Sequence, residues 1–193
     1  MRLIIGISGS TGAIYGVRLL EVLHQLPGME IHLVMSEGAK TTISYETEYR
    51  LEEVMEWAHT VHDPRNVGAS IASGTFLTSG MIVAPCSMKT LSSIANSYND
   101  NLLTRAADVC LKERRRLVLL VRETPLHLGY LRLMTAVTEC GGIILPPVPG
   151  FYQKPKTMLD LVDHSLGKAL DLFGIEHHLY PRWNGLTPPL AQS

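Results

Sequence analysis

Short apolar runs recur along this sequence, and each is followed by a small or polar turn and then by a segment with helical periodicity. The runs are residues 3–7, 31–35, 81–84, 117–121 and 143–145, and they are rich in Ile, Leu and Val. Strands of this nearly continuous apolar character are typical of a parallel sheet that is buried on both faces. The pattern therefore predicts an α/β fold: a single-domain, Rossmann-like (flavodoxin-like) parallel sheet with helices on both faces.

Segments with apolar residues every three or four positions separate these runs. Pro85 is expected to close the third strand, and Ser87 to cap the helix that follows it. One domain is predicted over residues 1–175, and an extended tail that contains several prolines over residues 176–193. Helices are expected over residues 13–26, 37–45, 51–58, 87–94, 102–115, 126–140 and 158–173.

The charge balance of 17 basic and 18 acidic residues removes the main electrostatic reason to expect nucleic-acid binding. Cys86, Cys110 and Cys140 are widely spaced and form no CxxC pair. This spacing argues against a disulfide framework or a zinc site and fits a reducing, cytoplasmic location. Residues 66–88 carry no charge, but their glycines and serines and Pro85 predict loop, strand and loop rather than a membrane span.

The first candidate site is the glycine turn after the first strand, where residues 6–12 fit the pattern GxxGxxG. Glycines let the backbone approach a ligand closely, and the start of the next helix offers N–H groups to an anion. Ser8, Ser10 and Thr11 add hydroxyl donors. Because the turn follows a strand and opens a helix, it predicts a nucleotide or flavin site. The alternative is a tight turn with capping hydroxyls, and the motif alone does not separate NAD from FMN.

Two observations favour FMN over NAD. Tyr152 and Lys156 have the spacing of a short-chain dehydrogenase pair, but Pro155 between them disfavours the helical turn that would align them. The second strand ends in Ser36, where a ribose-binding carboxylate would often stand. Glu37 comes next and could replace that carboxylate, so this second argument is the weaker one.

Polar and basic side chains also follow the third and fourth predicted strands. Ser87, Lys89 and Thr90 lie where a helix begins and could bind a phosphate or the polar edge of a flavin; the alternative is simple helix capping beside a solvated lysine. Arg122 stands at the carboxyl end of a buried strand, where such folds bind ligands, and its planar fork suits a phosphate. The arginines of residues 114–116 are expected to form a solvated face.

Tyr152 lies in a proline-rich loop after the last strand and can donate a hydrogen bond, whereas Lys168 lies on the last helix. Their alternative roles are packing and plain surface exposure. His59 and His62 could suggest a metal site, but no third ligand is evident nearby, so a polar loop is expected there. The other histidines, among them His164, are expected to be surface or packing residues.

Together these segments resemble the flavin prenyltransferase family of the UbiX type, whose older name is phenylacrylic acid decarboxylase. The matching stretches run in order along almost the whole chain, which makes them far more specific than any one motif. They are residues 9–13, 32–36, 46–48, 85–91, 105–109, 111–115, 121–125, 149–152 and 182–183.

The resemblance implies that the protein joins a dimethylallyl group from dimethylallyl phosphate to reduced FMN without a metal. The product, prenylated FMN, would serve a UbiD-type decarboxylase as its cofactor. The family also implies homo-oligomers, commonly dodecamers, with sites at the subunit interfaces. By itself the protein would not decarboxylate an aromatic acid, because no electron sink for that reaction is evident in the sequence.

The roles of individual residues are likewise implied by the resemblance. FMN would be held by Gly9, Ser10, Thr11, Ser36, Ser87, Met88, Lys89, Thr90 and Arg122. Tyr152 and Lys168 would bind the prenyl phosphate. Catalytic roles would fall to Glu123, Glu46, Arg105 and Lys112.

The sequence departs from the family where Ser10 and Thr11 replace the middle of a Gly-Ala-Ser-Gly turn, and where Lys168 replaces the arginine of some relatives. Some members also carry a tryptophan in the loop before residues 72–74, and this sequence has none there. The main alternative function is that of an FMN-dependent cysteine decarboxylase of related fold. A non-catalytic flavin-binding protein is a further alternative, and an NAD-dependent dehydrogenase comes last.

Overall fold

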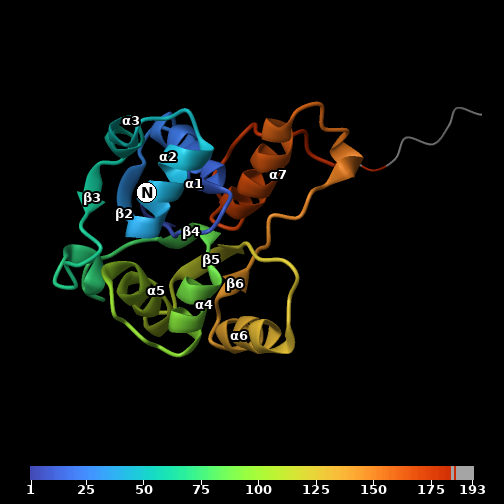
Figure 1. The fold of residues 1–193 in the computed structure, drawn as a ribbon. Coiled ribbons are helices and arrows are strands. Elements are labelled where there is room, and N and C mark those ends of the chain that lie inside the picture. Colours follow the sequence, from blue (N-terminus) through green and yellow to red (C-terminus); the bar gives the residue numbers. More distant parts are fainter. Residues whose placement is uncertain (184, 186–193) are drawn as a thin grey trace, which may run out of the picture.

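A computed structural model of the protein describes residues 1–183 and 185, and its sheet has six parallel strands in the order β3-β2-β1-β4-β5-β6 (Figure 1). The strands are β1 (Arg2–Ile7), β2 (Glu30–Met35), β3 (Thr60–His62), β4 (Gly80–Cys86), β5 (Arg116–Val121) and β6 (Ile143–Ile144). The α-helices are α1 (Ala13–His24), α2 (Glu37–Glu46), α3 (Leu51–Glu56), α4 (Met88–Ala95), α5 (Leu102–Lys112), α6 (Leu128–Glu139) and α7 (Met158–Asp171). Two short 3₁₀ turns are η1 (Ser70–Ala72) and η2 (Phe151–Gln153).

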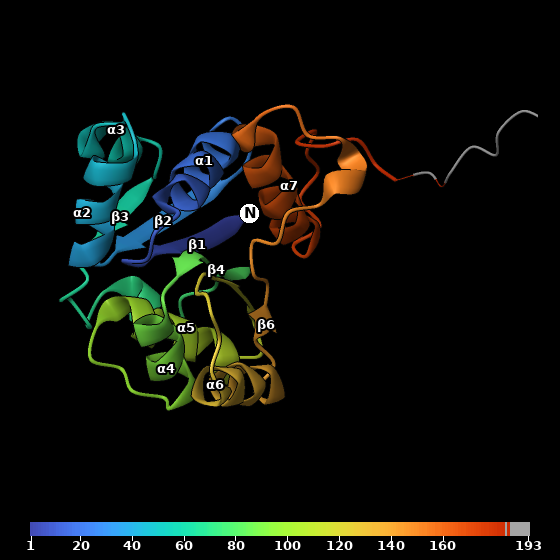
Figure 2. The same cartoon turned by 45° about the vertical axis from the view of Figure 1, so that its right-hand side comes forward.

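Helices cover both faces of the sheet, as Figure 2 shows. Leu3 and Ile5 of β1 point into a core formed with α1 and α7, whereas Ile4 between them points into a second core formed with α4, α5 and α6. This alternation follows from the period of two along a strand, and it explains why β1 is apolar from Leu3 to Ile7. The predicted α/β, Rossmann-like parallel sheet with helices on both faces is confirmed.

The order of the strands determines where a crevice for a ligand can form. β1 and β4 are neighbours in the middle of the sheet, but α1 covers one face and α4 the other, so the turns after the two strands diverge. Ser8 joins these turns: its buried hydroxyl donates to Pro85 O at 2.9 Å and accepts from the Ser87 N–H at 2.7 Å. Ser8 was expected to offer a donor to a ligand, and that expectation is wrong because both sides of its hydroxyl are used within the protein.

Three local predictions were wrong. Residues 60–62 form the edge strand β3 instead of a loop, and His62 belongs to it. The third strand does not close at Pro85 but continues to Cys86, which pairs with Val121 beyond an irregularity in the register. The helix predicted to reach residue 115 ends at Lys112, because Arg114 has a left-handed backbone (φ 57°) that an α-helix cannot continue through.

The extended tail predicted over residues 176–193 lies partly outside the described residues. Its described part forms no helix or strand, and the buried ring of His177 holds it to α7, with Nε2 3.0 Å from Gly167 O. In the part of the chain that the structure describes, no helix combines the length and the apolar character needed to cross a bilayer.

Candidate active site

A cavity of about 540 Å³ opens beyond the carboxyl ends of β1, β2 and β4, within the size range of small-molecule sites. It lies where α2, α4 and α5 begin, so the positive ends of three helix dipoles surround it. Among the predicted FMN-binding residues, Gly9, Ser36, Ser87, Lys89 and Thr90 line it. The structure thus brings together residues that follow three different strands.

The serines at this edge act as helix caps, and among the described residues the Ser36 and Thr90 hydroxyls keep a proton to donate. Ser36 Oγ accepts from Ala39 N at 3.1 Å, and Ser87 Oγ accepts from Thr90 N at 3.3 Å. Ser87 Oγ also lies 3.1 Å from Thr90 Oγ1 and donates to it, which leaves the Thr90 hydroxyl proton available. The Ser87 proton is thus used within the cap, and the hydroxyl proton that this pair can offer to a ligand is that of Thr90.

The glycine turn has features that fit a bound cofactor. A Cβ on Gly9 would come within 2.9 Å of the Gly38 backbone, so the turns after β1 and β2 meet backbone to backbone. Ser10 Oγ is buried without a hydrogen-bond partner among the described residues. A buried hydroxyl of this kind is satisfied by a ligand or a water. The donors at the starts of α2 and α4 line the cavity and suit the phosphate and the polar ring edge of FMN, whereas Ser10 lies next to the lining residue Gly9 and is not itself part of the lining.

The start of α1 is not free for an anion, which corrects one expectation for this turn. The Glu46 carboxylate accepts from Gly12 N at 2.8 Å and from Ala13 N at 3.0 Å. Burial raises the Glu46 pKa, but the hydrogen bonds from Thr11, Ala13 and Gly12 and the charge of Arg122 outweigh it, so the net pKa is lowered. An ionised carboxylate therefore occupies the position where a ligand phosphate was expected.

Arg122 directly follows the last residue of β5. Its N–H donates to Cys86 O at 3.1 Å, which ties it to the end of β4, and its charge acts on both Glu46 and Tyr15. Burial raises the Tyr15 pKa more than Ser165 and Arg122 lower it. Since Ser165 belongs to α7, these contacts connect the predicted FMN side of the site with the last helix.

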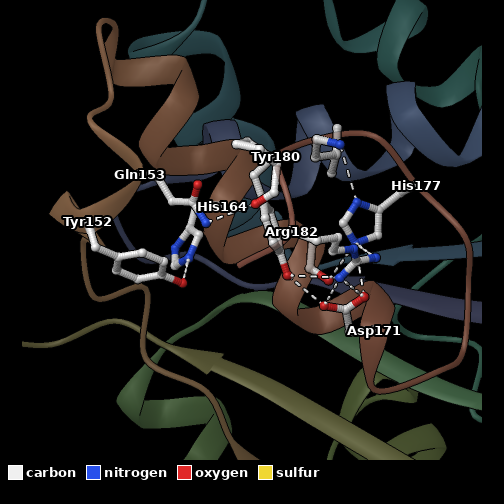
Figure 3. Close-up of polar contacts among 10 residues, drawn as sticks. Tyr152, Gln153, His164, Asp171, His177, Tyr180 and Arg182 are labelled. Carbon is white, nitrogen blue, oxygen red and sulfur yellow. Dashed lines mark hydrogen bonds and ion pairs between the residues drawn. The ribbon is translucent and has the colours of Figure 1, made fainter. Parts of the chain in front are cut away.

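Tyr152 meets α7 through His164, as Figure 3 shows. Tyr152 Oη is 3.0 Å from His164 Nε2, and the Trp183 ring lies edge-on to the Tyr152 ring with centroids 5.7 Å apart. Burial, and then the charge of Lys168, lower the His164 pKa. Lys168 is exposed one helical turn beyond His164, so Tyr152 and Lys168 flank the same histidine.

The remaining predicted residues do not line this cavity within a single chain. Arg105 on α5 donates to Ala72 O at 3.2 Å and pairs with Asp108 at 3.1 Å, and Lys112 pairs with Glu113 beside Gly74. Met88 packs its side chain into the core, Thr11 is exposed, and Glu123 accepts from Thr124 N at 3.0 Å.

Some residues of the cavity were missed by the sequence analysis. Arg65 lines it from the loop after β3, and Asn101 lines it while capping α5 through Thr104 N at 3.1 Å. Asn101 carries a local signal, an asparagine directly before an apolar helical run. Arg65 has no such local signal in the sequence, because its position in the cavity depends on the edge strand β3.

A family model described as Flavoprotein matches residues 1–138. Flavin prenyltransferase UbiX of Thauera aromatica is 58% identical over 185 residues, which cover 96% of this chain and 95% of that protein. The dodecameric FMN-dependent UbiX-like decarboxylase of Escherichia coli O157:H7 matches with a TM-score of 0.94 at 50% identity, over 96% of this chain and 100% of that one. AnUbiX, solved in complex with FMN and dimethylallyl pyrophosphate, also has a TM-score of 0.94, at 48% identity over 96% of this chain and 98% of that one.

An FMN-dependent cysteine decarboxylase of thioviridamide biosynthesis is only 16% identical, with a TM-score of 0.62 over 75% of this chain and 88% of that one. This last likeness concerns the fold alone. The high identity over nearly the full length of the UbiX proteins decides between the two groups. The chain belongs to the flavin prenyltransferase family of the UbiX type.

Proposed function

We propose that this protein transfers a dimethylallyl group from dimethylallyl phosphate to reduced FMN and so produces prenylated FMN. The observation that carries the proposal is the cavity beyond the carboxyl ends of β1 and β4. It is lined by helix starts and hydroxyl donors, in a chain 58% identical to a UbiX protein. The complex of AnUbiX with FMN and dimethylallyl pyrophosphate supports the same pair of ligands.

In this proposal Gly9, Ser36 and Ser87 hold FMN, together with the orphaned hydroxyl of Ser10 and with Lys89. The proposed FMN-binding set is completed by Thr11, Thr90, Arg122 and Met88. Met88 contributes through its backbone, because its side chain packs into the core. When bound, reduced FMN supplies the nucleophile that receives the allyl group. The protein keeps the flavin edge hydrogen-bonded and shields it from water.

The donor phosphate is bound by Tyr152 and Lys168 in this proposal. As the carbon–oxygen bond breaks, negative charge grows on the departing phosphate. The Tyr152 phenol, the Lys168 ammonium and the Arg122 guanidinium stabilise that charge. Glu123 passes a proton to that phosphate, and Glu46 holds the glycine turn in place. Aromatic and apolar groups shelter the allyl cation that develops.

We also propose that the chain assembles as a homo-oligomer, a dodecamer like its E. coli relative. Arg105 and Lys112 would then complete the pocket of a neighbouring subunit, because within one chain they face η1 and the residues after it. A UbiD-type decarboxylase would receive the product, and the three free cysteines favour a cytoplasmic setting.

The test is mass spectrometry of the bound flavin after the reduced protein is incubated with dimethylallyl monophosphate or with the diphosphate. A flavin heavier by one dimethylallyl group is expected. Bound but unmodified FMN with both donors would instead support a non-catalytic flavin protein. Decarboxylation of a peptide with a C-terminal cysteine would support the cysteine decarboxylase alternative.

A second assay separates this activity from the one that the older family name suggests. Protein, reduced FMN and dimethylallyl phosphate together should activate a separate apo-decarboxylase. The protein alone should release no carbon dioxide from an aromatic acid above background. Robust decarboxylation without a partner enzyme would contradict the proposal.

A further inference from the structure

His164 is buried on α7 and makes a specific polar contact with Tyr152. It is 8% exposed on α7, and its Nε2 lies 3.0 Å from Tyr152 Oη, with the two rings nearly perpendicular at 83° (Figure 3). A Cβ at Gly150 would approach the His164 ring to 2.7 Å, so the loop before η2 can close over the ring only with a glycine there. The loop is thus shaped to bring Tyr152 onto this histidine.

The proton of the His164 ring can be assigned to one nitrogen. Nδ1 is buried and has no hydrogen-bond partner among the described residues, whereas Nε2 faces the Tyr152 hydroxyl. A proton on Nδ1 would be a buried donor without an acceptor, which is rare in folded proteins. A proton on Nε2 is satisfied by Tyr152 Oη. Burial and Lys168 keep the ring neutral, so it carries one proton only.

We propose that His164 is a positioning residue for the donor phosphate: its Nε2–H donates to Tyr152 Oη and leaves the tyrosine proton to donate to a phosphate oxygen. This inference rests on the proposed function. A phenol that accepts one hydrogen bond is also a better donor of its own proton, because chained hydrogen bonds polarise one another. His164 therefore sets both the place and the donor role of the Tyr152 hydroxyl.

The other groups around His164 do not compete for this proton. Tyr180 packs against the ring with centroids 5.0 Å apart, but its hydroxyl donates to Asp171 at 2.6 Å, and Arg182 contacts the same carboxylate at 2.7 Å. Burial and Asp171 raise the Tyr180 pKa, so Tyr180 stays a neutral phenol. Lys168 is the cation nearest in sequence on the same helix, and its charge acts on the His164 ring.

Steady-state kinetics with His164→Leu, His164→Gln, Tyr152→Phe and the double variant His164→Leu/Tyr152→Phe tests the proposal. His164→Leu should raise KM for dimethylallyl phosphate about 5- to 10-fold, as expected for one lost hydrogen bond, with FMN affinity unchanged. His164→Gln, which keeps an N–H near the position of Nε2, should recover most of that loss. The double variant should be no worse than Tyr152→Phe alone. Fully additive losses, or an unchanged KM in His164→Leu, would overturn the assignment.

Two measurements do not require turnover, so they separate this inference from the proposed function. Magic-angle-spinning NMR of ¹⁵N-histidine-labelled protein, with His164→Gln used for assignment, should show His164 protonated at Nε2 alone. Calorimetric binding of inorganic phosphate to the FMN-loaded protein should weaken by a similar factor in His164→Leu and in Tyr152→Phe. Protonation at Nδ1 would refute the proposal. Absent prenylation with both of these results intact would refute only the proposed function.

Discussion

Serine hydroxyls that follow parallel strands look alike in the sequence but differ in what they can still bind. Ser8 Oγ has both a donor and an acceptor partner within the chain, so it holds two turns together. Ser36 and Ser87 accept from helix N–H groups and line the cavity, and Ser10 Oγ has no partner among the described residues. A hydroxyl is suited to a ligand when it both lines the cavity and keeps a proton to donate, which among these four serines describes Ser36.

Lys168 should contribute to the use of dimethylallyl phosphate and not to FMN binding. Lys168→Ala removes a charged contact to the donor phosphate and should cost about 1.5–3 kcal/mol in kcat/KM for dimethylallyl phosphate. FMN affinity, measured by calorimetry, should be unchanged. Lys156→Ala, an exposed lysine before α7, is the matched control and should behave as wild type. Loss of FMN binding with donor use retained would show that the role of Lys168 is assigned wrongly.

Glu46 should contribute stability in a pH-dependent way. Glu46→Gln removes the charge at the start of α1 and should lower the free energy of unfolding at pH 7 by about 0.5–1 kcal/mol. Because the folded-state pKa is lowered, the wild-type contribution is present above the ordinary carboxyl pKa and is lost as pH falls through the lowered value.

Urea unfolding of both proteins between pH 7 and pH 3 checks this prediction. The two stability curves should converge at the acid end, where the wild-type carboxyl is also neutral. Glu48→Gln, two residues further on, alters an exposed carboxylate that makes no hydrogen bond within the described residues and serves as control. A constant difference across the whole pH range would mean that the charge of Glu46 is not its source.

At the scale of elements, one carboxylate on α7 holds the segment that follows the helix. Asp171 accepts from Tyr180 Oη at 2.6 Å and from Arg182 at 2.7 Å, and it lies 3.2 Å from His177 Nε2 (Figure 3). Burial raises the Asp171 pKa, but the hydrogen bonds from Arg182 and Tyr180 outweigh it, so the net pKa is lowered. This anchoring also brings Trp183 against Tyr152.

Asp171→Asn should loosen that segment without unfolding the sheet. Its loss of charged hydrogen bonds should lower the free energy of unfolding by about 1–2 kcal/mol at pH 7. Hydrogen exchange should quicken at the Leu179 amide, which donates to His177 Nδ1 in the native chain, while β1 and β4 stay protected. Glu176→Gln, an exposed carboxylate in the same segment, should change neither. Unaltered exchange at Leu179 in Asp171→Asn would refute the anchoring role.

On the scale of the whole molecule, several large apolar side chains are exposed to solvent. Leu128 and Leu131 of α6 are 60% and 45% exposed, and Phe151, Met158 and Trp183 are exposed around η2, α7 and the segment after it. Exposed apolar side chains three positions apart on one helix, such as Leu128 and Leu131, are typical of surfaces that associate. The proposed homo-oligomer would cover these side chains.

The double variant Leu128→Lys/Leu131→Lys should therefore dissociate the assembly into smaller species. It should leave the fold of each chain intact, because these side chains are not part of its core. Light scattering coupled to gel filtration gives the mass, and circular dichroism checks the fold. Glu139→Lys, at the end of the same helix, is the control and should keep the wild-type mass. If the variant keeps the wild-type mass, α6 is not at an interface; if the wild type is a monomer, the oligomer proposal fails.

The sequence alone determined the sheet class, the alternation of helices and strands, and the turns after β1, β2 and β4. These depend on periodicity and turn chemistry, which act over a few neighbouring residues. It could not predict β3, because an edge strand of three residues with Thr60 and Val61 exposed has no apolar period to detect.

Tertiary structure alone decided which polar groups meet. Glu46 reaches the start of α1 across 34 positions of sequence, and Tyr152 meets His164 only because a loop folds back onto α7. It also separated Arg105 and Lys112 from Tyr152 within one chain, although all three belong to the same predicted pocket. Contacts of this kind depend on how the helices pack on the sheet, because packing brings together residues that no local pattern connects.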